Sequence, residues 1–383
     1  MLLADRLLTP EGRAVLAALG PDAIPDGDVL RTSERLRRQH DPALVAAAFA
    51  LHDLRIAART KFGRADAMWL TRPGLEQATA EPIARRHAER FRGVGQVADL
   101  CTGIGGDLIA LAAVADVLAV ELDPEHLRMA TLNAGVYGVE DRVTPWLGDV
   151  RDADLAGIDG VFIDPARRTA GGRLGPNASE PPLDWSVALV ERVSRVGIKA
   201  APGIDHAAAP PGWELELVAD GRDLKEAALW SPALATTSRR ATILPGGATL
   251  VSVPGDPVPI ADPGAWLLDP NPAVTRAGLV EDLARKVGAW KIDDQIAFLS
   301  TDAPTTTPFA RTLRVLDSLP WHERAIAARL RELGIGAVDI RRRGLAGDVE
   351  QIRKRLKLSG SGRATLAMTR LRDQPWCVIC ATE

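Results

Sequence analysis

The chain has 383 residues, of which 46% are hydrophobic, and its formal net charge is −3. This length exceeds one typical domain and predicts two or three, each with a hydrophobic core. Three cysteines are too few for a disulfide framework, and charged residues interrupt the apolar N-terminus in a way that excludes a signal peptide. No apolar run reaches the length of a membrane span, so we expect a cytoplasmic protein with no membrane partner.

Three regions follow one another along the chain. Residues 1–90 are rich in alanine and arginine at helical spacing and predict an N-terminal helical domain. Its clearest helix starts at Asp41 and Pro42, because aspartate caps helix ends and proline fits the first turn. Residues 91–252 alternate strand and helix patterns and predict a doubly wound α/β sheet, and residues 253–383 predict a C-terminal α+β domain.

A glycine turn at residues 99–107, DLCTGIGGD, joins a short apolar strand to a helix. Such a turn brings backbone N–H groups and a helix N-terminus close to a bound ligand. A dinucleotide fingerprint would need a third glycine at the position of Leu108. About twenty residues later a second apolar strand ends in Glu121, whose carboxylate can accept both hydroxyls of a ribose. The pattern therefore favours a cofactor that contains adenosine and lacks a pyrophosphate.

Carboxylates continue to fall where predicted strands end, at Asp99, Glu121, Asp149 and Asp164. In open α/β sheets the ligand crevice lies outside the carboxyl ends of the strands, so we expect these four side chains to meet at one site. The alternative for each is an ordinary turn residue without a ligand.

These motifs resemble the class I S-adenosylmethionine-dependent methyltransferases over about residues 96–250. The runs GIGGDLIALA and NAGVYGVEDRV are similar to those of trimethylguanosine synthase and its bacterial relatives, which methylate RNA, and EQATAEPIARRHAERF resembles the helix before their sheet. The C-terminal module looks like a THUMP-like domain, so nearly the whole chain resembles bacterial THUMP-like methyltransferases. The resemblance implies a Rossmann-like sheet, S-adenosylmethionine as cofactor, and tRNA or rRNA as partner.

The resemblance also implies residue roles in the cofactor pocket. The glycine turn would approach the methionine part, Glu121 would hold the ribose, Asp149 would face the adenine amino group, and Asp99 would contact the methionine amine. Two further acidic residues can have a structural role in place of cofactor binding, since Asp123 can cap the next helix and Asp107 can interact with a helix dipole. The predicted cofactor-binding residues are Gln77, Thr79, Asp99, Cys101, Thr102, Gly103, Gly105, Gly106, Asp107, Glu121, Leu122, Asp149, Val150 and Asp164.

The segment DPARR, residues 164–168, is the predicted acceptor site, with Asp164, Pro165 and Arg167 as catalytic candidates. Base-amine methyltransferases carry Asp, Asn or Ser, then two prolines and an aromatic ring at the matching motif, where this chain has Ala166 and Arg167. An arginine can stack on a base or bind a phosphate, so a nucleic-acid substrate still fits. A similar run occurs in uridine C5 methyltransferases, but these use a cysteine nucleophile downstream, and this chain has no Cys between residues 102 and 376. We therefore favour direct transfer to a ring or exocyclic nitrogen, with an oxygen as the weaker alternative.

The C-terminal region carries a local excess of positive charge. Eleven Lys or Arg face four Asp or Glu between Arg331 and Arg372. This patch predicts phosphate neutralisation, with a solvated helix face as the alternative. Lys199 ends a later strand and is expected to point into the crevice. The candidate substrate residues are Arg168, Lys199, Arg341, Arg342, Arg343, Arg353 and Lys354.

No metal site is expected. Cys377 and Cys380 have zinc-like spacing without a second pair, and they fit better as positions in a C-terminal strand, PWCVICA. The six histidines show no metal-ligand spacing. Besides an RNA methyltransferase, two readings stay open: an RNA-binding module that keeps cofactor affinity without transfer, and a methyltransferase of a protein or small molecule.

Overall fold

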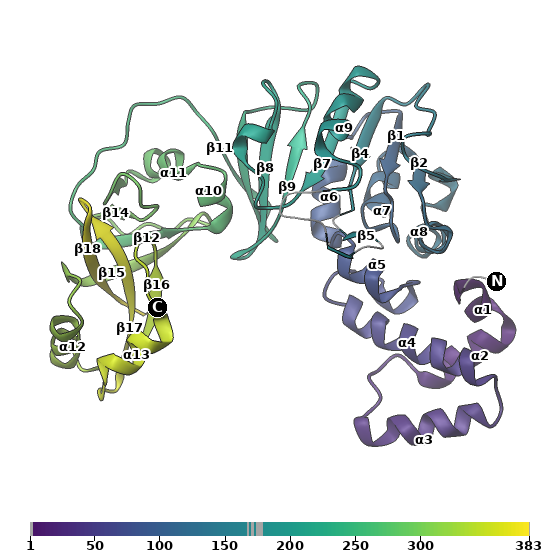
Figure 1. Ribbon diagram of the computed structural model, residues 1–383, viewed down its shortest axis with the longest axis horizontal. Helices are drawn as coiled ribbons and strands as arrows, with labels where there is room; N and C mark the ends of the chain where they lie inside the picture. The colour runs from purple at the N-terminus through teal and green to yellow at the C-terminus, as the bar shows by residue number, and fades with distance from the viewer. Residues whose placement is uncertain (1–2, 167, 170–171, 174–178, 383) are drawn as a thin grey trace. The chain divides into compact units, whose positions relative to one another are not determined.

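The computed structural model of the protein describes residues 3–166, 168–169, 172–173 and 179–382 (Figure 1). The chain divides into two compact units. The first comprises residues 1–214 and 227–236, and the second comprises residues 215–226 and 237–383.

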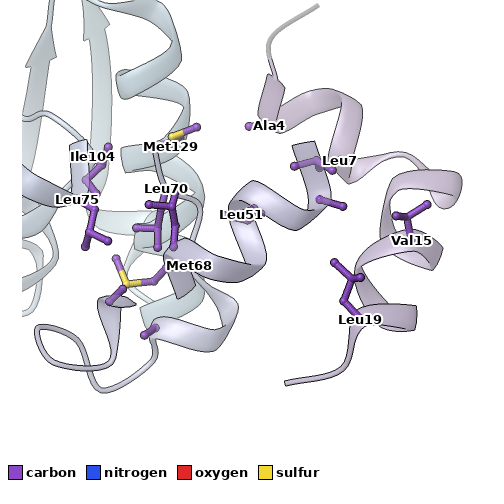
Figure 2. Close-up of a cluster of buried hydrophobic side chains, with 14 of the residues drawn as sticks. Ala4, Leu7, Val15, Leu19, Leu51, Met68, Leu70, Leu75, Ile104 and Met129 are labelled. Carbon is purple, nitrogen blue, oxygen red and sulfur yellow. The ribbon is translucent and has the colours of Figure 1, made fainter. Parts of the chain in front are cut away.

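The first unit begins with helices, as their alanine-rich spacing predicts. Asp41 caps the longest of them by accepting a hydrogen bond from the N–H of Ala43 at 2.8 Å. Apolar residues of these helices, such as Leu51, share one hydrophobic cluster with Ile104 and Met129 of the sheet region (Figure 2). The elements are α1 (Leu3–Leu8), α2 (Pro10–Leu19), α3 (Asp26–Arg37), α4 (Pro42–Ala58), η1 (Ala65–Ala67), α5 (Arg72–Gln77) and α6 (Glu81–Glu89).

The sheet of the first unit has the strand order β3-β2-β1-β4-β7-β9. The first five strands are parallel, and the last residues of β9, 227–230, pair antiparallel with β7. Helices α7 and α8 connect the first three strands, which confirms the predicted α/β sheet (Figure 1). The strands are β1 (Gln96–Leu100), β2 (Asp116–Glu121), β3 (Val143–Leu147), β4 (Gly160–Ile163), β7 (Arg195–Ala200) and β9 (Asp223–Trp230). The other elements are α7 (Gly106–Ala112), α8 (Pro124–Tyr137), η2 (Glu140–Arg142), β5 (Arg168–Thr169), β6 (Gly172–Arg173), α9 (Leu183–Ala188), η3 (Leu189–Glu191) and η4 (His206–Ala208).

An aromatic cluster holds α6 against the sheet. Phe162 of β4 lies with its ring centroid 6.4 Å from that of Phe91 and 6.1 Å from that of Trp230. The ring of His87 stacks on Phe162 at 4.7 Å. Gly197 leaves room for this cluster, because a Cβ there would lie 2.5 Å from a ring carbon of Trp230. The packing fixes the ring of His87 against Phe162 and Trp230.

The second unit contains two groups of strands. In one, β10 pairs parallel with β8 and antiparallel with β11. The other is a seven-stranded sheet with the order β13-β14-β12-β15-β18-β17-β16. The strands are β8 (Glu214–Asp220), β10 (Arg239–Leu244), β11 (Ala248–Val251), β12 (Trp266–Pro270), β13 (Trp290–Lys291), β14 (Leu299–Thr301), β15 (Ala310–Pro320), β16 (Ile335–Arg342), β17 (Gly362–Leu371) and β18 (Gln374–Ala381). The helices are α10 (Pro272–Arg276), α11 (Val280–Val287), α12 (Glu323–Glu332) and α13 (Val349–Leu356).

The two C-terminal cysteines are ordinary strand residues of β18. Cys377 and Cys380 are buried in different hydrophobic clusters, and burial raises the pKa of the Cys380 thiol to about 12. Among the residues that the structure describes, no three His, Cys, Asp or Glu side chains gather as ligands of a metal ion. In this same part of the chain, no helix combines the length and apolar character needed to cross a bilayer.

Candidate active site

The turn after β1 has a backbone that suits glycine. Gly103 and Gly105 have φ values of 57° and 93°, in the left-handed region that side chains disfavour. A Cβ at Gly105 would lie 3.2 Å from Cα of Ala130, and a Cβ at Gly106 would lie 3.0 Å from the backbone N of Thr79. The close approach of α8 and of residue 79 therefore requires small residues in the turn.

Glu121, at the end of β2, holds the turn in place. Its Oε2 accepts a hydrogen bond from the N–H of Gly103 at 2.7 Å. Its Oε1 accepts hydrogen bonds from the N–H groups of Leu122 and Asp123 at 2.9 and 3.0 Å. Asp123 in turn caps α8 by accepting from the N–H of Glu125 at 2.7 Å, so the capping alternative is correct for this residue.

A cavity of about 590 Å³ lies at the carboxyl ends of these strands. All the predicted cofactor residues except Gly105 line it, including Gln77 before the sheet and Val150 after β3. Further residues line the cavity. Ala78 and Ile104 belong to the quoted motifs but have no group that signals a ligand, and Arg151, two positions after Asp149, had the clearest signal. The missed residues are Gly74, Glu76, Ala78, Ile104, His126, Arg151, Glu180 and Pro181.

Two carboxylates of this cavity differ in their surroundings. Asp99 is buried, and its Oδ2 has no hydrogen-bond partner in the described part of the chain. Burial and the nearby carboxylate of Asp107 raise the pKa of Asp99 well above its ordinary value. Asp149, in contrast, forms an ion pair with Arg151 at 3.0 Å, and Arg151 also pairs with Glu180. The unpartnered carboxyl oxygen of Asp99 is suited to an ammonium group of a ligand.

Asp164 follows β4 and belongs to a network of buried side chains. Its Oδ2 accepts a hydrogen bond from Nζ of Lys199 at 2.7 Å, and Nζ also donates to Oγ1 of Thr79 at 2.7 Å. Thr79 donates to Oδ2 of Asp107 at 2.6 Å, and Oδ1 of Asp107 lies 2.7 Å from Nδ1 of His87. Lys199, expected to contact substrate, is therefore engaged with Asp164. Sequence spacing did not reveal the pairing of His87 with Asp107, because the two residues lie on different helices.

A second cavity, of about 230 Å³, adjoins the first at Asp164 and Pro165, which line both. Apolar side chains such as Leu183 and Ile204 form part of its wall. Arg167 lies outside the described residues. The further lining residues are Ser179, Lys199, Ala200, Ala201, Asp205 and Ala208.

Arg341 and Arg342, the last residues of β16, and Arg343, which follows it, make contacts within the second unit. Arg343 donates to Oδ1 of Asp269 at 2.8 Å, with its guanidinium 5.3 Å from the ring centroid of Phe298. Arg341 pairs with Asp339 at 2.8 Å. Partners of this kind explain why a count of basic residues does not predict which of them are available to a ligand. Of the other predicted residues, Arg342 donates to the carbonyl of Gly347, Arg353 pairs with Glu350, Lys354 is exposed on α13, and Arg168 lies in the short strand β5.

A groove of about 750 Å³ lies on the second unit, between β15, β16, β17 and α13. Four basic side chains line it, namely Arg311, Arg353, Lys357 and Arg363. Asp339 is the one acidic residue among the described residues that line this groove. The groove therefore has the charge of a site for an anionic ligand.

The cavity of the first unit matches the parts of S-adenosylmethionine. Asp99, with its unpartnered carboxyl oxygen, is the candidate to hold the methionine ammonium, and Glu121, which lines the same cavity, is the candidate for the ribose hydroxyls. Together, the Rossmann-like sheet and this cavity define the class of protein: an S-adenosylmethionine-dependent methyltransferase.

Comparison with known proteins agrees with this class and narrows it. The chain is 37% identical over 314 residues to an uncharacterized S-adenosylmethionine-dependent methyltransferase of Mycobacterium tuberculosis strains CDC 1551 and H37Rv, covering 79% of this chain and 85% of that protein. It therefore belongs to the same family of methyltransferases. The crystal structure of a protein from Porphyromonas gingivalis W83, described as a methyltransferase, has the same fold, with a TM-score of 0.76, 21% identity and coverage of 96% of this chain and 98% of that one.

Three family models match separate parts of the chain. Residues 94–178 match the model described as RNA cap guanine-N2 methyltransferase. Residues 310–382 match the model described as THUMP domain-like, as the C-terminal pattern of strands and basic residues predicted. Residues 4–58 match a model described as a domain of unknown function.

Proposed function

We propose that this methyltransferase transfers its methyl group to a nitrogen of a base in tRNA or rRNA. The observation that carries this proposal is that the two cavities meet at Asp164 and Pro165. A cofactor in the larger cavity and a base in the smaller one would then meet at the DPAR segment. The match of residues 94–178 to RNA cap guanine-N2 methyltransferases supports a base nitrogen as acceptor.

The chain contributes to this reaction chiefly by positioning. S-adenosylmethionine supplies an electrophilic methyl group, and alignment of the acceptor nitrogen can contribute roughly 7–11 kcal/mol in well-oriented systems. The Asp164 carboxylate accepts a hydrogen bond from the acceptor N–H and so orients the nitrogen lone pair. Bound S-adenosylmethionine would supply the methyl carbon, and the Asp164 carboxylate would receive the proton that the acceptor nitrogen loses and pass it to solvent. Apolar residues such as Leu183 and Ile204 provide a wall against which a base can pack.

The basic groove supports RNA as the substrate class. Arg311, Arg353, Lys357 and Arg363 line one surface of the second unit and can neutralise phosphates of a nucleic-acid backbone. Affinity of this origin falls steeply with salt and is largely independent of base sequence. A protein or neutral small-molecule substrate has no need for such a groove.

The direct test is methyl transfer from labelled S-adenosylmethionine to RNA from a strain that lacks the gene. We expect label in RNA, and digestion to nucleosides with mass spectrometry then identifies a base that carries the methyl group on nitrogen. S-adenosylhomocysteine binding without label in RNA would favour a binding module that has lost transfer. Label in protein or small molecules alone would favour a methyltransferase that acts on a protein or a small molecule.

The groove is tested separately by RNA binding over a salt series. Replacing Arg311 or Arg363 with alanine should reduce the slope of log K against log salt by about 1 each, because each removes one phosphate contact. Arg324→Ala is the matched control, since Arg324 is exposed on α12 and does not line the groove. Equal slopes for all three variants and the wild type would contradict a role of the groove in RNA binding.

A further inference from the structure

A network of buried polar side chains begins at Asp164 and reaches Thr79 and Asp107, which also line the cofactor cavity beside the glycine turn. It links Asp164 to Lys199 of β7, Thr79 between α5 and α6, Asp107 of α7 and His87 of α6, through contacts of 2.6–2.7 Å. The last four side chains belong to residues that are at most 8% exposed. Proteins rarely bury so many charged and polar groups unless each has a defined partner.

The direction of each hydrogen bond follows from the chemistry of the groups. The ammonium of Lys199 can only donate, so Oδ2 of Asp164 and Oγ1 of Thr79 both accept from it. The hydroxyl of Thr79 has one proton, which it donates to Oδ2 of Asp107. Thr79 therefore links the Lys199 ammonium to the Asp107 carboxylate, and the ammonium itself contacts Asp164.

The groups around Asp107 in this side-chain network favour its ionised form. Burial by itself would raise the pKa of Asp107, but His87, Lys199 and Thr79 outweigh burial and hold this pKa below its ordinary value. Asp107 is therefore a carboxylate that occupies both its oxygens within the protein. Lys199 lies between this carboxylate and Asp164, and an ammonium so placed favours the ionised form of both.

Two other titratable groups face Asp164 from β1 and the turn that follows it. Burial is the main reason why the pKa values of Asp99 and Cys101 are raised, and the negative charge of Asp164 adds to the effect for each. Burial therefore favours the uncharged form of both groups. Among the described residues, Lys199 places its ammonium 2.7 Å from Oδ2 of Asp164.

We infer that Lys199 is a positioning residue that keeps Asp164 ionised and oriented where the two cavities meet. Thr79, anchored by Asp107 and His87, fixes the ammonium in turn. The inference rests on the proposed function in one respect, since the acceptor N–H is taken to approach Asp164. An ionised, fixed carboxylate accepts a hydrogen bond, whereas a protonated one would present a donor to the acceptor nitrogen.

The first test needs no RNA. Carbon-13 NMR follows the titration of the Asp164 carboxyl carbon, assigned with Asp164→Asn, in the full-length protein. We expect the midpoint to rise by about 1 to 3 pH units in Lys199→Met, because an opposite charge this close normally lowers an aspartate midpoint by that amount. Lys225→Met is the matched control, since Lys225 forms a 2.6 Å ion pair with Asp223 in the second unit. An unchanged midpoint in Lys199→Met would overturn the inference.

Variants of Thr79 cover the case in which Lys199→Met does not fold. Thr79→Val removes the hydroxyl that receives the Lys199 hydrogen bond, so we expect the Asp164 midpoint to rise in the same direction by a smaller amount. Thr79→Ser retains the hydroxyl and should keep the wild-type midpoint. Equal midpoints in Thr79→Val and Thr79→Ser would show that Thr79 does not hold the ammonium.

The second test measures single-turnover methyl transfer to RNA from a strain lacking the gene. Lys199→Met should lose about 100-fold in rate, the usual effect of misplacing a reacting group. Its affinity for S-adenosylhomocysteine should stay within twofold of wild type, and the acid limb of its pH profile should move to higher pH. A raised KM for RNA with an unmoved Asp164 midpoint would instead make Lys199 a substrate contact. If the wild type methylates no RNA, the proposed function fails while the NMR titration still decides the role of Lys199.

Discussion

Glu121 offers the most direct test of the cofactor cavity, because one carboxylate has two tasks. Its oxygens accept three backbone hydrogen bonds, from Gly103, Leu122 and Asp123, at 2.7–3.0 Å. The same carboxylate lines the cavity and is our proposed partner of the ribose hydroxyls. The variant Glu121→Ala would therefore release the glycine turn and remove the ribose acceptor at once.

The size of the effect can be worked out from these contacts. A hydrogen bond to a charged group contributes about 1.5–3 kcal/mol. Water can replace the carboxylate at Leu122 and Asp123, which are exposed. The Gly103 bond is present without cofactor and affects stability, so the loss of binding comes from the contacts with the two ribose hydroxyls and is about 3 kcal/mol at the lower end. Since each 1.4 kcal/mol is a factor of ten, we expect Glu121→Ala to bind the cofactor roughly 100-fold more weakly.

Isothermal titration calorimetry with S-adenosylhomocysteine measures this change. Glu121→Gln, which keeps one acceptor oxygen without the charge, should bind with an affinity between those of wild type and Glu121→Ala. Glu140→Ala is a suitable control, because Glu140 is exposed and does not line the cavity. If Glu121→Ala binds within threefold of wild type with an unchanged Tm, the ribose assignment is wrong.

Three further predictions concern stability and reactivity. Gly197→Ala should lower the stability by about 1–3 kcal/mol in urea unfolding, because its Cβ would overlap the ring of Trp230; wild-type stability would contradict this. The pKa of Asp99 is raised in the folded protein, so the wild type loses stability as pH rises above about 4, the pKa of an unfolded aspartate. The Tm of Asp99→Asn should therefore exceed that of wild type by an amount that grows from pH 4 to pH 8. A Tm difference that stays constant with pH would refute this prediction. Cys377 and Cys380 should react with Ellman's reagent only on unfolding, since both thiols are buried; reaction in native protein would show otherwise.

Much of the sheet and of the cofactor turn is predictable from local sequence. Buried parallel strands need continuous apolar runs, and the left-handed backbone at Gly103 and Gly105 favours glycine. A few consecutive residues are therefore enough to predict the strands and the turn. The carboxylates Glu121 and Asp164 are predictable for a similar reason, because residues that follow parallel strands share one edge of the sheet. The cap formed by Asp123 is also local, since it involves residues two and three positions away.

Contacts between residues that are distant along the chain cannot be predicted from local sequence. The basic patch was visible in the sequence, but Arg343 contacts Asp269, which is 74 residues earlier, and is engaged within its own unit. Residues of the groove, such as Arg311 and Arg363, come from strands that only the sheet brings together. Charge counts report the average surroundings of a segment, whereas ion pairs depend on the packing of whole elements.

Local sequence encodes the class of sheet, the glycine turn and the line of carboxylates, because each depends on neighbouring residues and on strand ends. The side chains that support Asp164 are brought together by tertiary packing. Thr79, His87, Asp107 and Lys199 come from segments spread over more than a hundred residues, and they meet because α6 and α7 pack against the sheet and one another. No local sequence pattern predicts these side-chain contacts, because they result from the burial of apolar faces on separate elements.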